Sequence, residues 1–371
     1  MKKHIAIILG VLFFIIICVA CNGGRVKEIS EIEDLETKAD NGKGKVGVLL
    51  PNKTEERWEQ DAENITKALN AYGYQVHVEF AINNNHKQKI QMEGMLEEGV
   101  DCLVVSAVSS TGLKQQLEQA RAQAVPVIAY DRLLMDTDIV SYYASFDNEK
   151  VGISIGTYIK EKEELDKLRE QGKSKTIEFF MGSSDDNNAI LVYKGIMQVL
   201  EEYLKDKTLV CKSKKTEFEN TSINKWSSYI AEKNAVSTLR SSYKTEHVDI
   251  MCCASDGIAS GVIAALEQEG YTEENWPLIT GQDAGVEAVR YIAAGKQAMS
   301  VYKDTRLLAD KCVTMVRAEL EGIKPEINNE SSYDNGVFKV PSYLCTGIVV
   351  DKENYQEILL DSKYYEISQL E

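Results

Sequence analysis

Short apolar segments alternate with longer helical segments along most of the chain, and this alternation limits the possible folds more than any other feature. The apolar segments are rich in β-branched residues, which favour strands at residues 45–50, 76–80, 101–106, 125–130, 176–182, 208–211, 248–255, 277–281 and 298–302. Helical periodicity is found between them, near residues 55–72, 86–98, 110–123, 187–204, 226–241 and 257–269. Strands that are apolar on both faces and alternate with helices form parallel sheets covered on both sides.

The number of expected strands is too large for one ordinary open sheet. From Lys45 onward the chain has about 325 residues, which is enough for two domains of roughly 100–200 residues each. The extended piece SYYASFDN (141–148) separates the two series of strands, and we expect it to cross between lobes. We therefore predict an α/β fold of two doubly wound parallel-sheet lobes. The sequence has no P-loop and no dinucleotide-binding fingerprint.

The N-terminus has the pattern of a bacterial export signal. Lys2 and Lys3 precede an apolar stretch at residues 5–20, which is short for a membrane span and ends in a small residue before Cys21. This end resembles a lipobox, in which Cys21 is lipidated after residues 1–20 are removed; Cys18 stands where Leu is usual. The alternative is an uncleaved N-terminal anchor helix. Either way, the rest of the chain is expected outside the cytoplasm, held at the cell membrane.

Residues 21–44 have the composition of a flexible tether, because charged residues, Gly and Asn dominate and little can be buried. The formal net charge of −16 falls to near −18 once Lys2 and Lys3 leave with the signal. This charge argues against nucleic acid and against an anionic membrane surface as partners.

Cysteine and histidine usage gives no sign of a metal or cofactor. Four cysteines lie in apolar strand or helix patterns, and we expect them to be small buried side chains: Cys102, Cys252, Cys253 and Cys312. The body has no CxxC pair and no Cys/His cluster at metal-ligand spacing. We expect no metal site and no cofactor.

Polar side chains follow six of the expected strands, where ligands of open parallel sheets bind. These candidate residues are Arg57, Trp58, Asp131, Arg132, Asp186, Asn187, Asn188, Asp256, Asp283 and Lys303. Trp226, which opens a helix in the second half, is a further candidate. Carboxylates, amides and cations form strong charge-assisted hydrogen bonds with sugar hydroxyls, and Trp faces can stack on the C–H surface of a sugar ring. The set is of a sugar-binding type.

Each candidate also has a structural explanation. Asp131, Asp256 and Asp283 stand where helix N-caps stand, and capping alone favours Asp there. Residues 185–188 can form a solvated turn and Lys303 can be a surface residue. The tryptophans Trp58 and Trp226 can be core residues.

Seven motifs together give the chain a resemblance to a known family. They are ERW (56–58), VPVIAYDRL (125–133), SFDNEKVG (145–152), MGSSDDNNA (181–189), ASDGIASG (254–261), ITGQDAGVEAVRYIAAGKQ (279–297) and VYKDTRLLA (301–309). Over roughly residues 45–322 the chain resembles the type I periplasmic binding proteins, in the branch of xylose-binding and multiple-sugar-binding receptors. The family's usual Pro or Val in the DNN loop is replaced by Ser184-Asp185, and the match around Trp226 is looser.

The resemblance implies one monosaccharide bound between two lobes that are joined by a hinge of three strands. It implies that the eleven candidate residues named above contact the sugar. We expect a first lobe at residues 45–146 plus 284–330 and a second at 147–283 plus 331–371. The long loop at 331–343 is expected to return through the hinge.

The function implied is that of an extracytoplasmic lipoprotein delivering a sugar to the membrane subunits of an ABC importer, and we expect a monomer. A sensor docking on a histidine kinase or chemoreceptor is the alternative. The Arg57 and Arg132 pair fits a xylose-like pyranose, while glucose, galactose and arabinose stay open.

Two further classes fit the sequence less well. A glycoside-processing enzyme needs a carboxylate pair about a scissile bond, and a pocket that encloses a monosaccharide holds no leaving group, so we expect no enzyme. A lac-repressor-type regulator needs a basic helix-turn-helix ahead of the body, where this chain has an export signal and an acidic tether.

Overall fold

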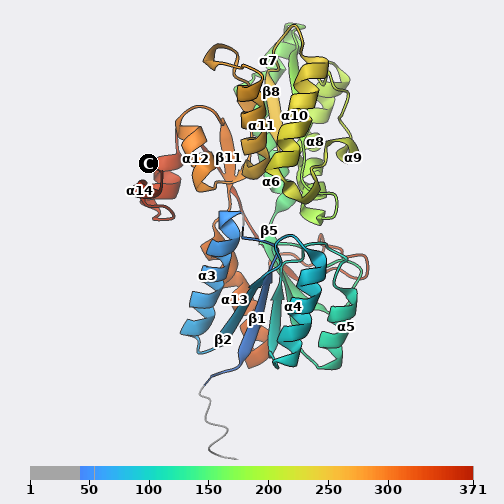
Figure 1. Cartoon of the computed structure of the whole chain (residues 1–371), viewed down its shortest axis with the longest axis vertical. Coiled ribbons are helices and arrows are strands. Elements are labelled where there is room, and N and C mark those ends of the chain that lie inside the picture. The colour runs from blue at the N-terminus through green and yellow to red at the C-terminus, as the bar shows by residue number, and fades with distance from the viewer. Residues whose placement is uncertain (1–41, 54, 371) are drawn as a thin grey trace, which may run out of the picture. The chain divides into compact units, whose positions relative to one another are not determined.

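The computed structural model describes residues 42–53 and 55–370 (Figure 1). The predicted signal (1–20), Cys21 and nearly all of the tether (21–44) lie outside the described residues. The body from Lys43 onward is a compact unit of its own. Within the described part of the chain, no helix is long and apolar enough to cross a membrane.

The first lobe is built on a six-stranded parallel sheet in the order β12-β5-β4-β3-β1-β2. Its strands are β1 (Lys45–Leu50), β2 (Gln75–Phe80), β3 (Cys102–Val105), β4 (Val127–Tyr130), β5 (Val140–Phe146) and β12 (Ser342–Cys345). One face is covered by α3 (Glu56–Ala71) and α13 (Thr305–Glu321), the other by α4 (Asn85–Glu97) and α5 (Lys114–Ala122). Alternate residues of β1 pack into the two opposite cores, which is why these strands are apolar throughout.

The second lobe contains a four-stranded parallel sheet in the order β7-β6-β8-β9. Its strands are β6 (Lys175–Phe180), β7 (Leu209–Val210), β8 (Ile250–Cys253) and β9 (Leu278–Ile279). One face is covered by α6 (Asn148–Lys162) and α8 (Asn187–Lys205), the other by α10 (Ser228–Ser242) and α11 (Asp256–Gln268). Shorter helices lie in the connections: α7 (Leu165–Glu170), α9 (Phe218–Thr221), η1 (Asn224–Trp226) and η2 (Glu273–Asn275).

Three more strands continue this lobe towards the hinge: β10 (Gln282–Asp283), β11 (Met299–Tyr302) and the antiparallel β13 (Ile348–Asp351). The Ala298 amide donates to the Ile279 carbonyl at 2.8 Å, which links β9 to the segment that begins β11. Beside these strands lie α12 (Val286–Ala293), η3 (Gln356–Asp361) and α14 (Ile367–Leu370).

Within the described residues, the chain passes between the lobes after β5, between β11 and α13, and between β12 and β13. This confirms the predicted α/β fold with two lobes and the three-strand hinge. The buried positions of Cys102, Cys252, Cys253 and Cys312 are also as expected, and all four thiols are free.

The packing differs from the predicted lobe boundaries in two segments. Residues 284–330 were assigned to the first lobe, yet Met299 and Val301 pack in the core of the second. Residues 331–371 were assigned to the second lobe, yet β12 completes the first sheet, and the 331–343 loop packs there through Tyr333, whose ring lies 5.3 Å from that of Tyr143. In both segments the chain crosses from one lobe to the other. The sequence of a short apolar strand does not indicate which of the two sheets it joins.

The predicted crossing at residues 141–148 is largely β5 itself, a buried strand of the first sheet. The chain leaves the first lobe only at Asp147, which caps α6 by accepting from the Lys150 amide at 3.2 Å.

Candidate binding site

A cavity of about 290 Å³ lies between the lobes, at the carboxyl ends of strands from both. Ten of the eleven predicted site residues line it: Arg57, Trp58, Asp131, Arg132, Asp186, Asn188, Trp226, Asp256, Asp283 and Lys303. Asn187 does not; it is the half-buried first residue of α8. Parallel strands end at the same edge of a sheet, which is why residues far apart in the sequence meet here.

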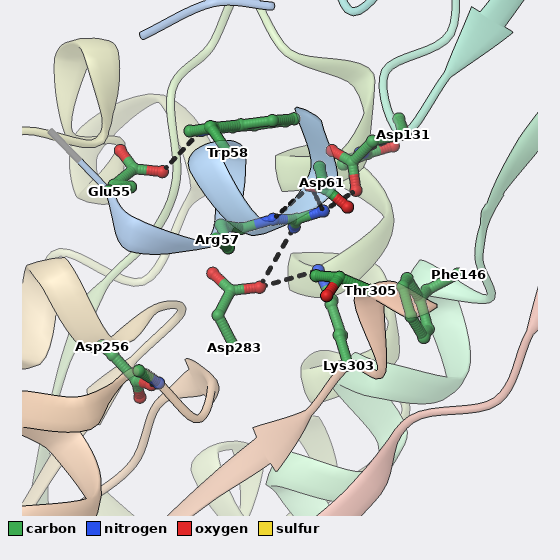
Figure 2. A network of polar contacts seen from close by, with 12 residues as sticks. Glu55, Arg57, Trp58, Asp61, Asp131, Phe146, Asp256, Asp283, Lys303 and Thr305 are labelled. Atoms are coloured by element: carbon green, nitrogen blue, oxygen red, sulfur yellow. Dashed lines mark hydrogen bonds and ion pairs between the residues drawn. The ribbon is translucent and has the colours of Figure 1, made fainter. Parts of the chain in front are cut away.

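Arg57 is the centre of a buried charge network (Figure 2). Its guanidinium pairs with Asp131 at 2.8 Å, with Asp61 at 3.2 Å and, across the cavity, with Asp283 at 3.2 Å. It also lies 4.5 Å from the ring centre of Trp58, in a cation–π contact. Burial opposes the charge on Arg57, but the three carboxylates outweigh it and hold its pKa well above the usual range. Arg57 is therefore a fixed cation.

Asp61 pairs with Arg57 on the side away from the cavity and so helps to orient its guanidinium. It is fully buried, one helical turn after Arg57 on α3, and it also accepts a hydrogen bond from the Tyr130 hydroxyl. Burial raises the pKa of Asp61 to about 6, and the nearby Arg57 limits the rise. Asp131 differs: burial alone would raise its pKa, but Arg57, Lys303 and Arg132 together lower it. Asp131 is thus an anion held ready to accept hydrogen bonds.

A second ion pair joins the lobes beside the first. Nε of Arg132 lies 3.0 Å from Asp186, whose carboxylate also accepts from the Trp226 indole at 3.1 Å. The amide of Asn188 donates to the Asp131 carbonyl at 2.8 Å, again from one lobe to the other. These bonds fix the positions of the cavity walls relative to each other.

Asp256 also lines the cavity, and it lies apart from Arg57 and Lys303 (Figure 2). Its carboxylate accepts from the Gln297 amide at 2.8 Å, the Ser300 hydroxyl at 2.8 Å and the Gly285 backbone amide at 3.1 Å. Burial, and then the negative charge of Asp283, raise the pKa of Asp256 to about 7.

Three cavity residues have left-handed backbones, which non-glycine residues rarely adopt. The φ angles are +59° at Asp131, +56° at Trp226 and +97° at Asp283. Such conformations persist where the surroundings enforce them, and they gather at ligand-binding sites. At Asp131 the enforcing bonds reach the backbone carbonyl from the hydroxyls of Tyr143 (2.6 Å) and Ser145 (2.8 Å).

The capping explanation accounts for few of these residues. Ser255, rather than Asp256, caps α11, and α12 begins after Gly285, beyond Asp283. Asp186 does cap α8 while it pairs with Arg132. The core explanation holds in part for Trp58, which is 2% exposed and packs in the first-lobe core, while it also lines the cavity.

Several cavity residues were missed in the sequence. The polar ones are Glu55, Glu56, Ser255, Ser260, Gln282, Glu287 and Tyr291. Glu56, Ser255 and Gln282 directly flank predicted residues at the same strand ends, so the strand-end rule could have found them. Ser260 and Tyr291 lie one helical turn after Asp256 and Glu287, and helical spacing is the only signal for them.

Comparison with known proteins gives the class. Residues 46–324 match the family model described as "Periplasmic binding protein domain". The chain is 38% identical to the multiple sugar-binding periplasmic receptor ChvE of Rhizobium radiobacter, covering 88% of this chain and 92% of that protein. It is 31% identical to the D-xylose-binding periplasmic protein of Escherichia coli, with the same coverage of each.

Solved structures agree. The chain is similar to an ABC transporter solute binding protein from Clostridium phytofermentans with bound β-D-glucose, at 40% identity and a TM-score of 0.85 over 88% of this chain and 100% of that one. A carbohydrate transporter solute binding protein from Chloroflexus aurantiacus in complex with D-glucose is 30% identical, with a TM-score of 0.77 over 87% and 97%.

The chain therefore belongs to the periplasmic binding protein family, in its xylose-binding and multiple-sugar-binding branch. Proteins of this family bind solutes without transforming them, and the chain is not an enzyme.

Proposed function

We propose that this protein is an extracytoplasmic lipoprotein that binds one monosaccharide and delivers it to an ABC importer. The observation that carries the proposal is that ten of the predicted residues, nine from strand ends of both lobes together with Trp226, line one cavity between the lobes. Related proteins described as sugar-binding and as solute-binding components of ABC transporters support it.

In the proposed complex, the side chains of Arg57, Arg132 and Lys303 donate to ring and hydroxyl oxygens, and Asp131 and Asp256 accept from hydroxyls. These charge-assisted hydrogen bonds are roughly twice as strong as neutral ones. The indoles of Trp58 and Trp226 offer apolar faces to the C–H surface of the ring. Asn187 is the least supported member of the predicted set because it does not line the cavity.

The ligand we propose is an aldopyranose such as xylose or glucose. The xylose-like assignment comes from the sequence, while the Clostridium phytofermentans relative contains β-D-glucose. Isothermal titration of residues 22–371 against a panel of pentoses and hexoses tests this directly. One-to-one binding of an aldopyranose is expected, and no binding to any member of the panel would contradict the proposed function.

The membrane anchor and the importer are separate parts of the proposal. If Cys21 is lipidated, the wild-type protein should fractionate with membranes and the Cys21→Ala variant should be released. If the Cys21→Ala variant also stays with the membranes, an uncleaved anchor helix is favoured. Delivery to an importer predicts that cells lacking the gene lose uptake of the labelled sugar. Unchanged uptake with lost transcriptional or chemotactic response would instead indicate a sensor. We propose that the protein acts as a monomer.

A further inference from the structure

The C-terminal segment, residues 352–370, packs behind one wall of the cavity and does not line the cavity itself. It contains η3 and α14, and α14 lies beside α12 (Figure 1). Leu359 and Tyr365 are almost fully buried, in a cluster with Ala284 and Tyr302. None of residues 352–370 lines the cavity, but the segment packs on the backbone that carries Asp283 and Lys303.

Tyr365 holds the strained turn that presents Asp283. Its hydroxyl, in a side chain that is 3% exposed, donates to the Ala284 carbonyl at 3.1 Å. The Ala284 amide donates to the Ser300 hydroxyl at 2.9 Å, so both sides of this residue are fixed. Asp283 and Ala284 have consecutive positive φ angles of +97° and +52°. Because such backbones persist only when their surroundings hold them, Tyr365 helps to keep Asp283 directed at Arg57.

Tyr364 connects the same segment to the first lobe. Its hydroxyl donates to the Gln60 side chain on α3 at 2.8 Å and lies 3.2 Å from the Thr305 hydroxyl. Its ring lies 4.8 Å from that of Tyr365 and 4.7 Å from that of Tyr302, the residue before Lys303. The three tyrosines therefore form a continuous contact from α3 to the Asp283 turn.

Two arginines fix the segment on either side of the hinge. Arg306, on α13 of the first lobe, donates to the Ser362 carbonyl at 3.1 Å. Arg290, on α12, donates to the Gln369 carbonyl at 2.7 Å and to the Leu370 carbonyl at 3.2 Å. The segment is thus bonded to both lobes as well as to the turn between them.

We propose that Tyr364 and Tyr365 are positioning residues for sugar binding: Tyr365 fixes the Asp283 turn, and Tyr364 connects that turn to the first lobe. The proposal rests on the proposed sugar-binding function. It makes the C-terminal segment a determinant of affinity although no residue in it reaches the ligand.

The first test is Tyr365→Phe, which removes one hydroxyl and keeps the ring. The substitution leaves the buried Ala284 carbonyl without its donor, so we expect the sugar affinity measured by isothermal titration to be about tenfold weaker. Tyr355→Phe is the matched control. Tyr355 lies in the same segment, but within the described residues its hydroxyl bonds only to the neighbouring Gln356 side chain, from which it accepts, so affinity should not change. Equal affinity of Tyr365→Phe and wild type would overturn the proposal.

A double-mutant cycle separates positioning from general destabilisation. If Tyr365 acts through Asp283, Tyr365→Phe should have little further effect on affinity in an Asp283→Ala background. The same loss in both backgrounds would overturn the proposal. If Tyr365→Phe does not fold, Gln60→Leu is the alternative test, because it removes the acceptor on α3 to which the Tyr364 hydroxyl donates. This variant should bind the sugar several-fold more weakly. Wild-type affinity would contradict the proposal. Wild-type protein that binds no sugar would refute the proposed function itself, which is a distinguishable failure.

Discussion

Gly182→Ala should weaken sugar binding although Gly182 itself does not line the cavity. Gly182 follows β6, and a methyl group added there would lie 2.1 Å from Cη2 and 2.3 Å from Cζ2 of the Trp226 ring. The backbone on both sides is fixed, because the Ile223 amide donates to the Met181 carbonyl at 3.0 Å. The indole must therefore move, and its 3.1 Å hydrogen bond to Asp186 is lost.

The magnitude follows from that bond. A hydrogen bond to a charged group contributes about 1.5–3 kcal/mol, and roughly 1.4 kcal/mol corresponds to a factor of ten in affinity. We expect the Kd for the preferred sugar to rise at least about tenfold, measured by isothermal titration and by the sugar-induced change in tryptophan fluorescence.

Gly94→Ala is the control for this substitution. Gly94 lies within α4, and apart from its chain neighbours and the backbone of its own helix, the described residues place no heavy atom within 4 Å of the added methyl group. Its sugar affinity should equal that of wild type, and alanine should if anything stabilise the helix. If Gly182→Ala also kept wild-type affinity and fluorescence, the assignment of Trp226 to the sugar site would be refuted.

Three further predictions concern stability, pH and ligand charge. Gly195→Ala places a methyl group 2.1 Å from the Glu149 carbonyl and forces α6 and α8 apart, so thermal unfolding should occur at lower temperature, with a loss of about 1–3 kcal/mol; an unchanged Tm would contradict the close helix packing. The pKa of Asp256 rises from 3.8 to about 7 on folding, so the folded state binds more protons between these values, and the unfolding free energy of the sugar-free protein falls as pH rises through this window. Asp256→Asn should remove this contribution to the pH dependence of stability. The check is to measure the unfolding free energy of both proteins by denaturant titration at low and at neutral pH. If that free energy changes with pH by the same amount in both proteins, Asp256 does not contribute in this way. Finally, D-glucuronate should bind far more weakly than D-glucose at neutral pH, because seven carboxylates and only three cationic side chains line the cavity. The carboxylates are Glu55, Glu56, Asp131, Asp186, Asp256, Asp283 and Glu287, and the cations are Arg57, Arg132 and Lys303. Equal affinities for the two sugars would show that this excess of negative charge does not act on the ligand.

Most strands of the two parallel sheets could be read from the sequence, because they are buried on both faces and so form continuous apolar runs; β5, expected as a crossing between lobes, and β12 are the exceptions in the first sheet. Among the strands that the sequence does not predict, β12 and β13 are four residues each and follow a long polar loop. Their positions depend on pairing with β5 and β11, partners that are distant in the sequence. The lobe boundaries were misplaced for the same reason.

The residues that line the cavity were largely predictable, because the carboxyl ends of parallel strands meet at one edge of the sheet. Asp61 was not predicted, since a carboxylate inside a helix ordinarily faces solvent; only its spacing of four residues from Arg57 hints at an ion pair. The contacts of Tyr364 and Tyr365 had no sequence signal at all. They join α3, the Asp283 turn and the C-terminal segment, which only the folded chain brings together.

The central claim is that strand-end residues of both lobes form one sugar site. The most direct test is isothermal titration of Arg132→Ala and Asp256→Ala, one residue from each lobe, with the sugar that the wild-type protein binds best. Removing a buried, hydrogen-bonded charged group costs about 2–5 kcal/mol, so each variant should bind well over tenfold more weakly. Wild-type affinity in both variants would contradict the account.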